Sequence, residues 1–292
     1  MGRDRFGVGL CGLLTGLLVW TGALVVLESA GKAAPTKGKV AKRAKKKGAC
    51  IALRKAPERI GQLKALRAGW FYPWGAEPGG DDPPEDMQFV PMIWGKWGLK
   101  GEVPPVIARL IEGRKAGRYE CLLGFNEPDN KNQANMTVAE AIEQWPKLMK
   151  TGLRLGSPGA VQATGPWMRE FMKEIDKRKY RVDFIAVHWY NPPDAGALLG
   201  HLRNIHKLYG RPIWITEFAA ADWKATSREK NRYTPAKVAE FMKRVVPALE
   251  KLDYVKGYAW FSPSPDDKKL GPSALFTKAG KLTKLGKLYA SF

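Results

Sequence analysis

The stretches CLLGFNEP at residues 121–128 and PIWITEF at residues 212–218 share one pattern. In each of them an apolar run is followed at once by a glutamate, Glu127 in the first and Glu217 in the second. Short, nearly continuous apolar runs are typical of strands that are buried on both faces, as in parallel sheets. Because a carboxylate has no place in such a core, we expect both glutamates where their strands leave it.

Six further apolar runs alternate with segments of helical pattern. The strand-like runs lie at residues 49–52, 68–72, 88–94, 154–157, 182–189 and 255–261. Helices are predicted at residues 137–150, 166–177, 195–209, 235–252 and 283–290, several of them opening on Thr or Pro. Eight strands that alternate with helices predict an α/β protein, a (β/α)8 TIM barrel over residues 49–292. An open doubly wound sheet is the alternative, but no G-x-G-x-x-G motif follows a strand.

The strand order gives the two glutamates a shared location. Glu127 ends the fourth run and Glu217 ends the seventh, so a closed barrel lets them face each other across its mouth. Glycosidic cleavage by retaining enzymes uses two carboxyl groups about 5–5.5 Å apart. One of them donates a proton, which requires a raised pKa, and the other stays ionised and attacks.

Several segments together resemble one family of barrel glycosidases. Asn-Glu-Pro after the fourth strand with Glu after the seventh is similar to the clan of retaining (β/α)8 glycosidases. The chain as a whole resembles glycoside hydrolase family 128, the endo-β-1,3-glucanases with an alkali-sensitive-linkage-like catalytic domain. The segments that carry this resemblance are WFYPW at 70–74, FVPMIWG at 89–95, LGFNEPD at 123–129, GSP at 156–158, VDFIAVHWY at 182–190, WITEF at 214–218 and YAWF at 258–261.

The resemblance implies endo-cleavage of β-1,3-glucan with retention of configuration. By position, Glu127 corresponds to the acid/base, Glu217 to the nucleophile, and Asn126 to the residue that holds the sugar 2-hydroxyl. The chain departs from the family at 70–74, where Trp-Tyr-Tyr-Asn-Trp is common and this sequence has Phe71 and Pro73. Loss of that Asn removes an amide that could contact sugar, so the preferred glucan is left open.

Polar and aromatic residues near the strand ends are candidates for substrate binding. His188 and Tyr190 are two residues apart on the sixth run, so both side chains are expected on one side. The alternative for His188 is a histidine satisfied within the barrel. Because exposed rings stack on sugar faces, we also assign substrate contacts to the aromatic residues Trp70, Tyr72, Trp74, Trp94 and Trp260. The alternative is that a tryptophan in the barrel interior belongs to the core.

The first 48 residues differ from the rest. Residues 1–31 combine Arg3 and Arg5 with an apolar run and a small-residue motif, which predicts a signal peptide or an N-terminal membrane anchor. Residues 32–48 are rich in Lys, Ala and Gly and predict a flexible basic linker. The protein is therefore expected to be exported, either secreted or anchored on the outer side of the cytoplasmic membrane.

The net charge of +21 is not confined to these segments. Residues 1–48 hold ten basic and two acidic residues, and the other 39 basic and 26 acidic residues leave +13 on residues 49–292. Such charge favours electrostatic adsorption to an anionic cell envelope. Because export argues against a nucleic-acid partner, the expected partner is a polysaccharide, β-glucan, bound by a monomer.

The cysteines and histidines do not form a recognisable metal motif, and no cofactor or metal is expected. Cys50 and Cys121 could form one bridge, but two buried thiols are the favoured interpretation.

Three other functions remain open. A related retaining β-glycanase, such as a mannanase or cellulase, would keep the same carboxylates. A glucan-binding protein with weak turnover would keep the barrel. A basic envelope protein would depend on its charge alone.

Overall fold

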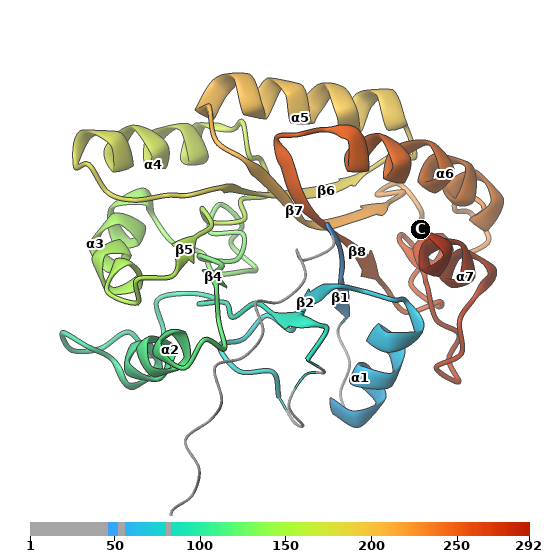
Figure 1. The fold of residues 1–292 in the computed structure, drawn as a ribbon. Coiled ribbons are helices and arrows are strands. Elements are labelled where there is room, and N and C mark those ends of the chain that lie inside the picture. The colour runs from blue at the N-terminus through green and yellow to red at the C-terminus, as the bar shows by residue number, and fades with distance from the viewer. Residues whose placement is uncertain (1–45, 52–55, 80–82, 84) are drawn as a thin grey trace, which may run out of the picture. The chain divides into compact units, whose positions relative to one another are not determined.

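Eight parallel strands form the centre of the fold (Figure 1). The computed structural model describes residues 46–51, 56–79, 83 and 85–292. These belong to the second of two compact units, Ala41–Phe292, and the expected leader at residues 1–31 lies outside the described residues. The strands are β1 (Lys47–Ile51), β2 (Trp70–Tyr72), β3 (Gln88–Phe89), β4 (Cys121–Leu122), β5 (Arg154–Leu155), β6 (Ile185–Asn191), β7 (Ile213–Ala220) and β8 (Val255–Ser262).

The strands close into a ring in chain order. Six of them form one parallel sheet in the order β3-β2-β1-β8-β7-β6, and β4 pairs with β5 in a second parallel sheet. Isolated parallel bridges join the two sheets, Met92 with Leu123 on one side and Gly156 with Phe184 on the other. The pairing of β1 with β8 closes the ring, which confirms the predicted (β/α)8 barrel.

Helices surround this ring and connect most strands (Figure 1). They are α1 (Ala56–Ala65), α2 (Pro105–Lys115), α3 (Val138–Met149), α4 (Pro166–Lys177), α5 (Ala195–Tyr209), α6 (Pro235–Lys251) and α7 (Lys284–Ser291), with a short 3₁₀ helix η1 (Gly271–Ser273) before α7. Between β2 and β3 the described residues contain no helix. Within the described part of the chain, no helix has the length and apolar character needed to cross a membrane.

Local signals place the helix starts where the sequence predicted them. Thr137 accepts a hydrogen bond from the Glu140 amide, and the Glu140 side chain accepts one from the Thr137 amide, which completes a capping box before α3. Thr234 and Thr283 cap α6 and α7 in the same way through their hydroxyls. Gly210 ends α5 with φ of 63°, a conformation that favours glycine.

The first strand begins earlier than expected. The predicted linker ran to residue 48, but Lys47 and Gly48 belong to β1 and pair with Tyr258 and Ala259 of β8. The reason is that Lys47 is buried and its Nζ donates to the carbonyl of Tyr289, so this lysine is part of the barrel rather than of a solvated tail.

The buried side chains divide into two groups. The larger group fills the space between the strands and the helices, and the smaller lines the barrel interior. Cys50 and Cys121 belong to the interior group and are free thiols, which confirms the favoured interpretation over a bridge. Phe71, one of the two departures noted at residues 70–74, belongs to the outer group and packs against Phe89, so this departure does not face the barrel mouth.

Candidate active site

A bulge in β7 aims Glu217 into the barrel. Trp214 belongs to the interior group, while Ile213, Ile215 and Phe218 belong to the outer group. Strict alternation after Ile215 would send residue 217 outward. The register between β6 and β7 instead shifts, so that Val187 pairs with Ile215 and His188 pairs with Glu217. The extra residue restores an inward direction to Glu217, as bulges beside active sites commonly do.

Three hydrogen-bond donors converge on the Glu217 carboxylate, which is buried. Oε1 accepts from the Tyr72 hydroxyl at 2.8 Å and from Nε1 of Trp74 at 2.7 Å, and Oε2 accepts from the Tyr190 hydroxyl at 2.5 Å. Burial and then the charge of Glu217 raise the pKa of both Tyr72 and Tyr190, so both phenols remain protonated donors. The carboxylate is therefore fixed from three directions.

Glu127 follows β4 in a left-handed backbone conformation. Its φ is 41°, which a glutamate rarely adopts and which costs free energy unless the surroundings hold it. The Glu127 amide donates to the carbonyl of Gly159 at 2.9 Å, and Oε2 accepts from Nδ2 of Asn130 at 3.1 Å. These contacts hold the side chain toward the barrel axis.

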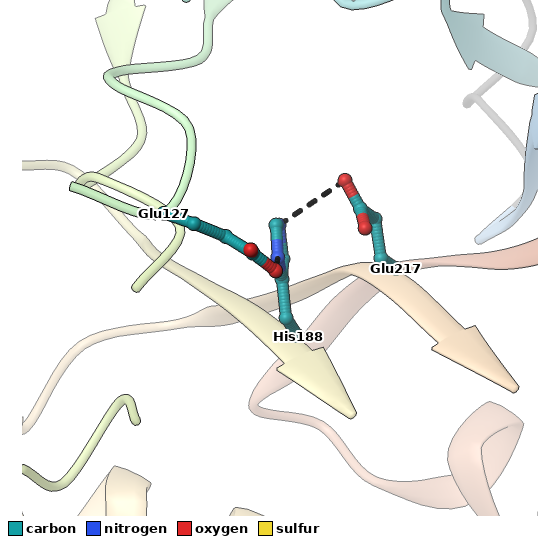
Figure 2. Close-up of side chains that lie close together, drawn as sticks. All are labelled: Glu127, His188 and Glu217. Carbon is teal, nitrogen blue, oxygen red and sulfur yellow. Dashed lines mark hydrogen bonds and ion pairs between the residues drawn. The ribbon is translucent and has the colours of Figure 1, made fainter. Parts of the chain in front are cut away.

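His188 lies between the two carboxylates (Figure 2). Its Nδ1 is 3.1 Å from Oε1 of Glu127, and its Nε2 is 3.4 Å from Oε1 of Glu217. One oxygen or nitrogen of each of the three residues lies within 4.8 Å of the others. The predicted facing of Glu127 and Glu217 is thus present, with an imidazole between them.

Glu127, His188 and Glu217, here named the triad, differ from expectation in the pKa of Glu127. Burial raises the pKa of Glu127, but the hydrogen bond and charge of His188 and the hydrogen bond from Asn130 outweigh it, and the net shift is downward. Burial lowers the pKa of His188, but the charge of Glu217 and the hydrogen bond and charge of Glu127 together outweigh burial, and the net shift is upward. The expectation of a raised pKa on the proton donor is therefore wrong, because the hydrogen bond and charge of His188 and the hydrogen bond from Asn130 stabilise the Glu127 anion.

Tyr190 contacts the carboxylate of Glu217, and Asn126 directly precedes Glu127 in the chain. His188 and Tyr190 both contact Glu217, so their side chains share one side of β6. The Asn126 side chain donates through Nδ2 to Gln133, while its buried Oδ1 has no hydrogen-bond partner among the described residues. A ligand hydroxyl could satisfy that oxygen.

The predicted aromatic residues divide between cleft and core. Trp74 and Trp94 are half-buried and line an open groove of about 450 Å³, together with Trp97 and Arg109. Trp94 stacks on Trp97 with ring centroids 5.4 Å apart. Because Trp74 also donates to Glu217, this groove leads to the carboxylates. Tyr72 is buried and reaches Glu217 only through its hydroxyl.

Trp70 and Trp260 do not lie in a groove, and the prediction for these two is wrong. Trp70 is 1% exposed inside the barrel, and its Nε1 donates to the carbonyl of Lys46. Trp260 is fully buried between β8 and the helices, and its Nε1 donates to the carbonyl of Ser273. In both residues the indole N–H donates to a backbone carbonyl, so the ring can be buried without leaving a polar group unsatisfied.

Three residues near the site were not anticipated. Asn130 lies three positions after Glu127, a spacing that suits a turn and could have suggested the contact. Trp97 is 60% exposed and Trp223 is 55% exposed. Both follow strands in loops, where an exposed indole is a stronger sign of ligand binding than one within a strand.

The triad also has the donor atoms of a metal site. Glu127, His188 and Glu217 each offer one ligand atom. However, the Tyr72, Trp74 and Tyr190 donors point hydrogen atoms at Glu217, where a cation would be repelled. The arrangement therefore favours hydrogen bonding, and the absence of a metal stays a prediction.

The fold has counterparts in known proteins. Residues 48–289 match the model of the glycosyl hydrolase catalytic core. A family 128 (subgroup I) endo-β-1,3-glucanase variant from Amycolatopsis mediterranei, in complex with laminaripentaose, is 33% identical with a TM-score of 0.73, covering 85% of this chain and 99% of that one. A subgroup II endo-β-1,3-glucanase from Sorangium cellulosum is 26% identical with a TM-score of 0.66, covering 85% and 98%.

A curated relative matches part of the chain. Alkali-sensitive linkage protein 1 of Schizosaccharomyces pombe is 31% identical over 182 residues, which is 58% of this chain and 32% of that protein. The match thus spans about a third of the relative's length. The chain belongs to the glycosyl hydrolase catalytic core family and, within it, to glycoside hydrolase family 128. It is a glycoside hydrolase.

Proposed function

We propose that this protein cleaves β-1,3-glucan internally with retention of configuration, using Glu127 as acid/base and Glu217 as nucleophile. The observation that carries the proposal is the carboxylate pair, since one oxygen of Glu127 and one of Glu217 lie within 4.8 Å of each other beside His188. A separation of about 5–5.5 Å between carboxyl groups suits direct attack, whereas inverting enzymes need room for a water at about 6.5–9.5 Å.

The hydrogen bonds favour these two roles over the reverse. Glu217 is locked by three donors, as a nucleophile that must meet the anomeric carbon at a fixed place requires. Glu127 has fewer donors and a more exposed side chain, 13% against 6% for Glu217, so it can reach an incoming leaving group.

The proton for the first step can come from His188. The lowered pKa of Glu127 and the raised pKa of His188 both favour a proton on the imidazole over a proton on the Glu127 carboxylate. Transfer from Nδ1 of His188 to Oε1 of Glu127 leaves the charge of the triad unchanged. A bound sugar would cover the exposed part of Glu127, and the added desolvation favours its neutral form. Glu127 then protonates the leaving oxygen while Glu217 attacks.

The relatives support the substrate. The solved structures at 33–34% identity are named as endo-β-1,3-glucanases in complex with laminari-oligosaccharides, and they include variants with one or another glutamate replaced. The unpartnered Oδ1 of Asn126 is available to accept from a sugar 2-hydroxyl. The open groove along Trp74 and Trp94 suits a chain that extends beyond the cleavage point.

The direct test is hydrolysis of a polysaccharide panel by residues 46–292. Laminarin and curdlan should be cut to oligosaccharides of several lengths, while mannan and carboxymethylcellulose should stay intact. If mannan or cellulose is cleaved as fast as laminarin or faster, the protein is a related β-glycanase instead. Tight binding of laminarin without products would indicate a glucan-binding protein.

A further inference from the structure

The two loops that follow β7 and β8 concentrate positive charge at the mouth of the barrel. Residues 221–234 and 264–281, here named the basic rim, hold eight Lys or Arg and four Asp or Glu residues, a net +4. They make up about an eighth of residues 49–292 and carry about a third of its +13 charge. The charge of the barrel is therefore denser here than average.

Internal hydrogen bonds hold the basic rim as one unit. Asp222 is 1% exposed, and its carboxylate accepts from Nε of Arg232 at 2.9 Å and from Nη2 at 2.5 Å. The Asp222 amide donates to the carbonyl of Lys269 at 3.0 Å. Nδ2 of Asn231 donates to the carbonyls of Lys268 and Lys269, both at 3.0 Å. The two loops are thus fixed to each other before any partner arrives.

Much of the positive charge on the basic rim is not neutralised. Asp266 pairs with Arg228 at 3.5 Å and with Lys278 at 2.6 Å. Four exposed lysines form no ion pair with any described residue, namely Lys224, Lys230, Lys268 and Lys281. These ammonium groups are available to an external anion.

An exposed indole connects the basic rim to the active site. Trp223 is 55% exposed, and its Nε1 donates to the carbonyl of Tyr190 at 2.7 Å. The Tyr190 hydroxyl in turn donates to Glu217. Nζ of Lys269 lies 5.1 Å from the centre of a Trp223 ring, which combines an aromatic face with a cation.

We infer that the basic rim binds a polysaccharide of uronic acids alongside the hydrolytic cleft, with one sugar ring on Trp223 and carboxylates on the exposed lysines of the two loops. A concentration of ammonium groups attracts a polyanion over long range, whereas a neutral glucan feels no such attraction. The exposed indole beside a carbohydrate cleft favours a sugar chain over other polyanions. The inference goes beyond the proposed function, because binding at the basic rim requires no turnover.

The test is binding of polygalacturonate to the intact chain and to two matched variants. The first carries Lys224→Glu, Lys230→Glu, Lys268→Glu and Lys281→Glu. The control carries Lys173→Glu, Lys207→Glu, Lys251→Glu and Lys256→Glu, four exposed lysines outside the basic rim and without ion pairs to described residues. Both variants change the net charge equally, so a difference between them reports location.

Polygalacturonate should bind the native chain at low salt, and the basic-rim variant should lose about tenfold or more in affinity. The control should lose markedly less, and fully methyl-esterified polygalacturonate should bind weakly to all three. Raising the salt from about 0.1 M to about 1 M should remove the difference, since the Debye length falls from about 10 Å to about 3 Å. Trp223→Ala should weaken binding at both salt concentrations.

Three outcomes would overturn the inference. Equal losses in the two lysine variants would show that only net charge matters. Equal binding of the esterified polymer would remove the role of the carboxylates. Tighter binding of anionic lipid vesicles or of RNA than of polygalacturonate would assign the surface to another partner. Laminarin hydrolysis, measured in parallel, reports on the proposed function separately.

Discussion

Nδ1 of His188 lies 3.1 Å from Oε1 of Glu127, and both side chains are largely buried. The pair therefore links the protonation of the site to the stability of the fold. Its partner on the other side is Glu217, 3.4 Å from Nε2 (Figure 2).

Replacing this histidine should change how stability depends on pH. Because folding raises the pKa of His188, its contribution is full below its unfolded value of about 6.5 and is lost as pH rises through the folded value. The lowered pKa of Glu127 gives a contribution that is present above its unfolded value of about 4.3 and is lost as pH falls through the folded value. His188→Gln should therefore cost most stability between these values, near pH 5–6.

Urea unfolding of the native chain and His188→Gln between about pH 5 and pH 9 checks this. The difference in unfolding free energy should shrink as pH rises. A difference that is constant or grows over this range would contradict the charged bridge.

Gly159→Ala should disturb catalysis through His188. A Cβ at residue 159 would lie 2.7 Å from Nε2 of His188, closer than real Cβ contacts, so the ring must move. We expect kcat to fall about tenfold to a hundredfold, since small displacements of catalytic groups are costly. Gly200→Ala is the matched control, because its nearest neighbour is the flexible end of Arg203 at 3.8 Å and a helical alanine is favoured. Circular dichroism and laminarin kinetics of both variants decide it, and unchanged kcat in Gly159→Ala would count against a positioned imidazole.

Replacing a buried tryptophan should lower stability, whereas replacing an exposed tryptophan of the groove should lower activity. Trp260→Ala should cost about 3–5 kcal/mol of stability, as for other buried aromatic side chains. Trp97→Ala should leave stability within about 0.5 kcal/mol and reduce kcat/KM for long laminari-oligosaccharides roughly two- to tenfold, which corresponds to about 0.5–1.5 kcal/mol of stacking. Thermal unfolding and chain-length kinetics test both. Wild-type kinetics in Trp97→Ala would exclude the groove as a glucan site.

Glu127→Gln and Glu217→Gln should each remove nearly all hydrolysis while the barrel stays folded. General acid–base assistance alone is worth about 10²–10⁴-fold, and loss of the nucleophile should cost at least as much. Glu170→Gln, an exposed residue on α4, provides the control and should keep native activity. Retention of more than about a tenth of the activity by either folded variant would refute its role.

Local chemistry explains what the sequence could predict. The capping box at Thr137 and the prolines that begin α4 and α6 act within one turn, so those helix starts need no tertiary information. The apolar runs before Glu127 and Glu217 likewise mark buried parallel strands. These local patterns were enough to predict the barrel and to predict that Glu127 and Glu217 lie at the same site.

Side-chain direction and local pKa could not be predicted in the same way. Glu217 points inward because of a bulge, and nothing in its neighbouring residues marks that extra position. Trp260 is buried between β8 and the helices, and its indole hydrogen is accepted by the carbonyl of Ser273 in η1, an element that its own strand does not reveal. The lowered pKa of Glu127 depends on His188, 61 residues away in sequence. Each feature arises from contacts between different elements of the fold rather than within one turn.

The most direct test of double displacement is azide rescue followed by the stereochemistry of the product. In Glu217→Gly, azide should replace the missing nucleophile and give the inverted glycosyl azide. In Glu127→Gly, azide should capture the covalent intermediate on Glu217 and give the retained glycosyl azide. NMR of the anomeric proton distinguishes the two products. Interchanged products would show that the roles are reversed, and rescue of neither folded variant would contradict a covalent intermediate on Glu217.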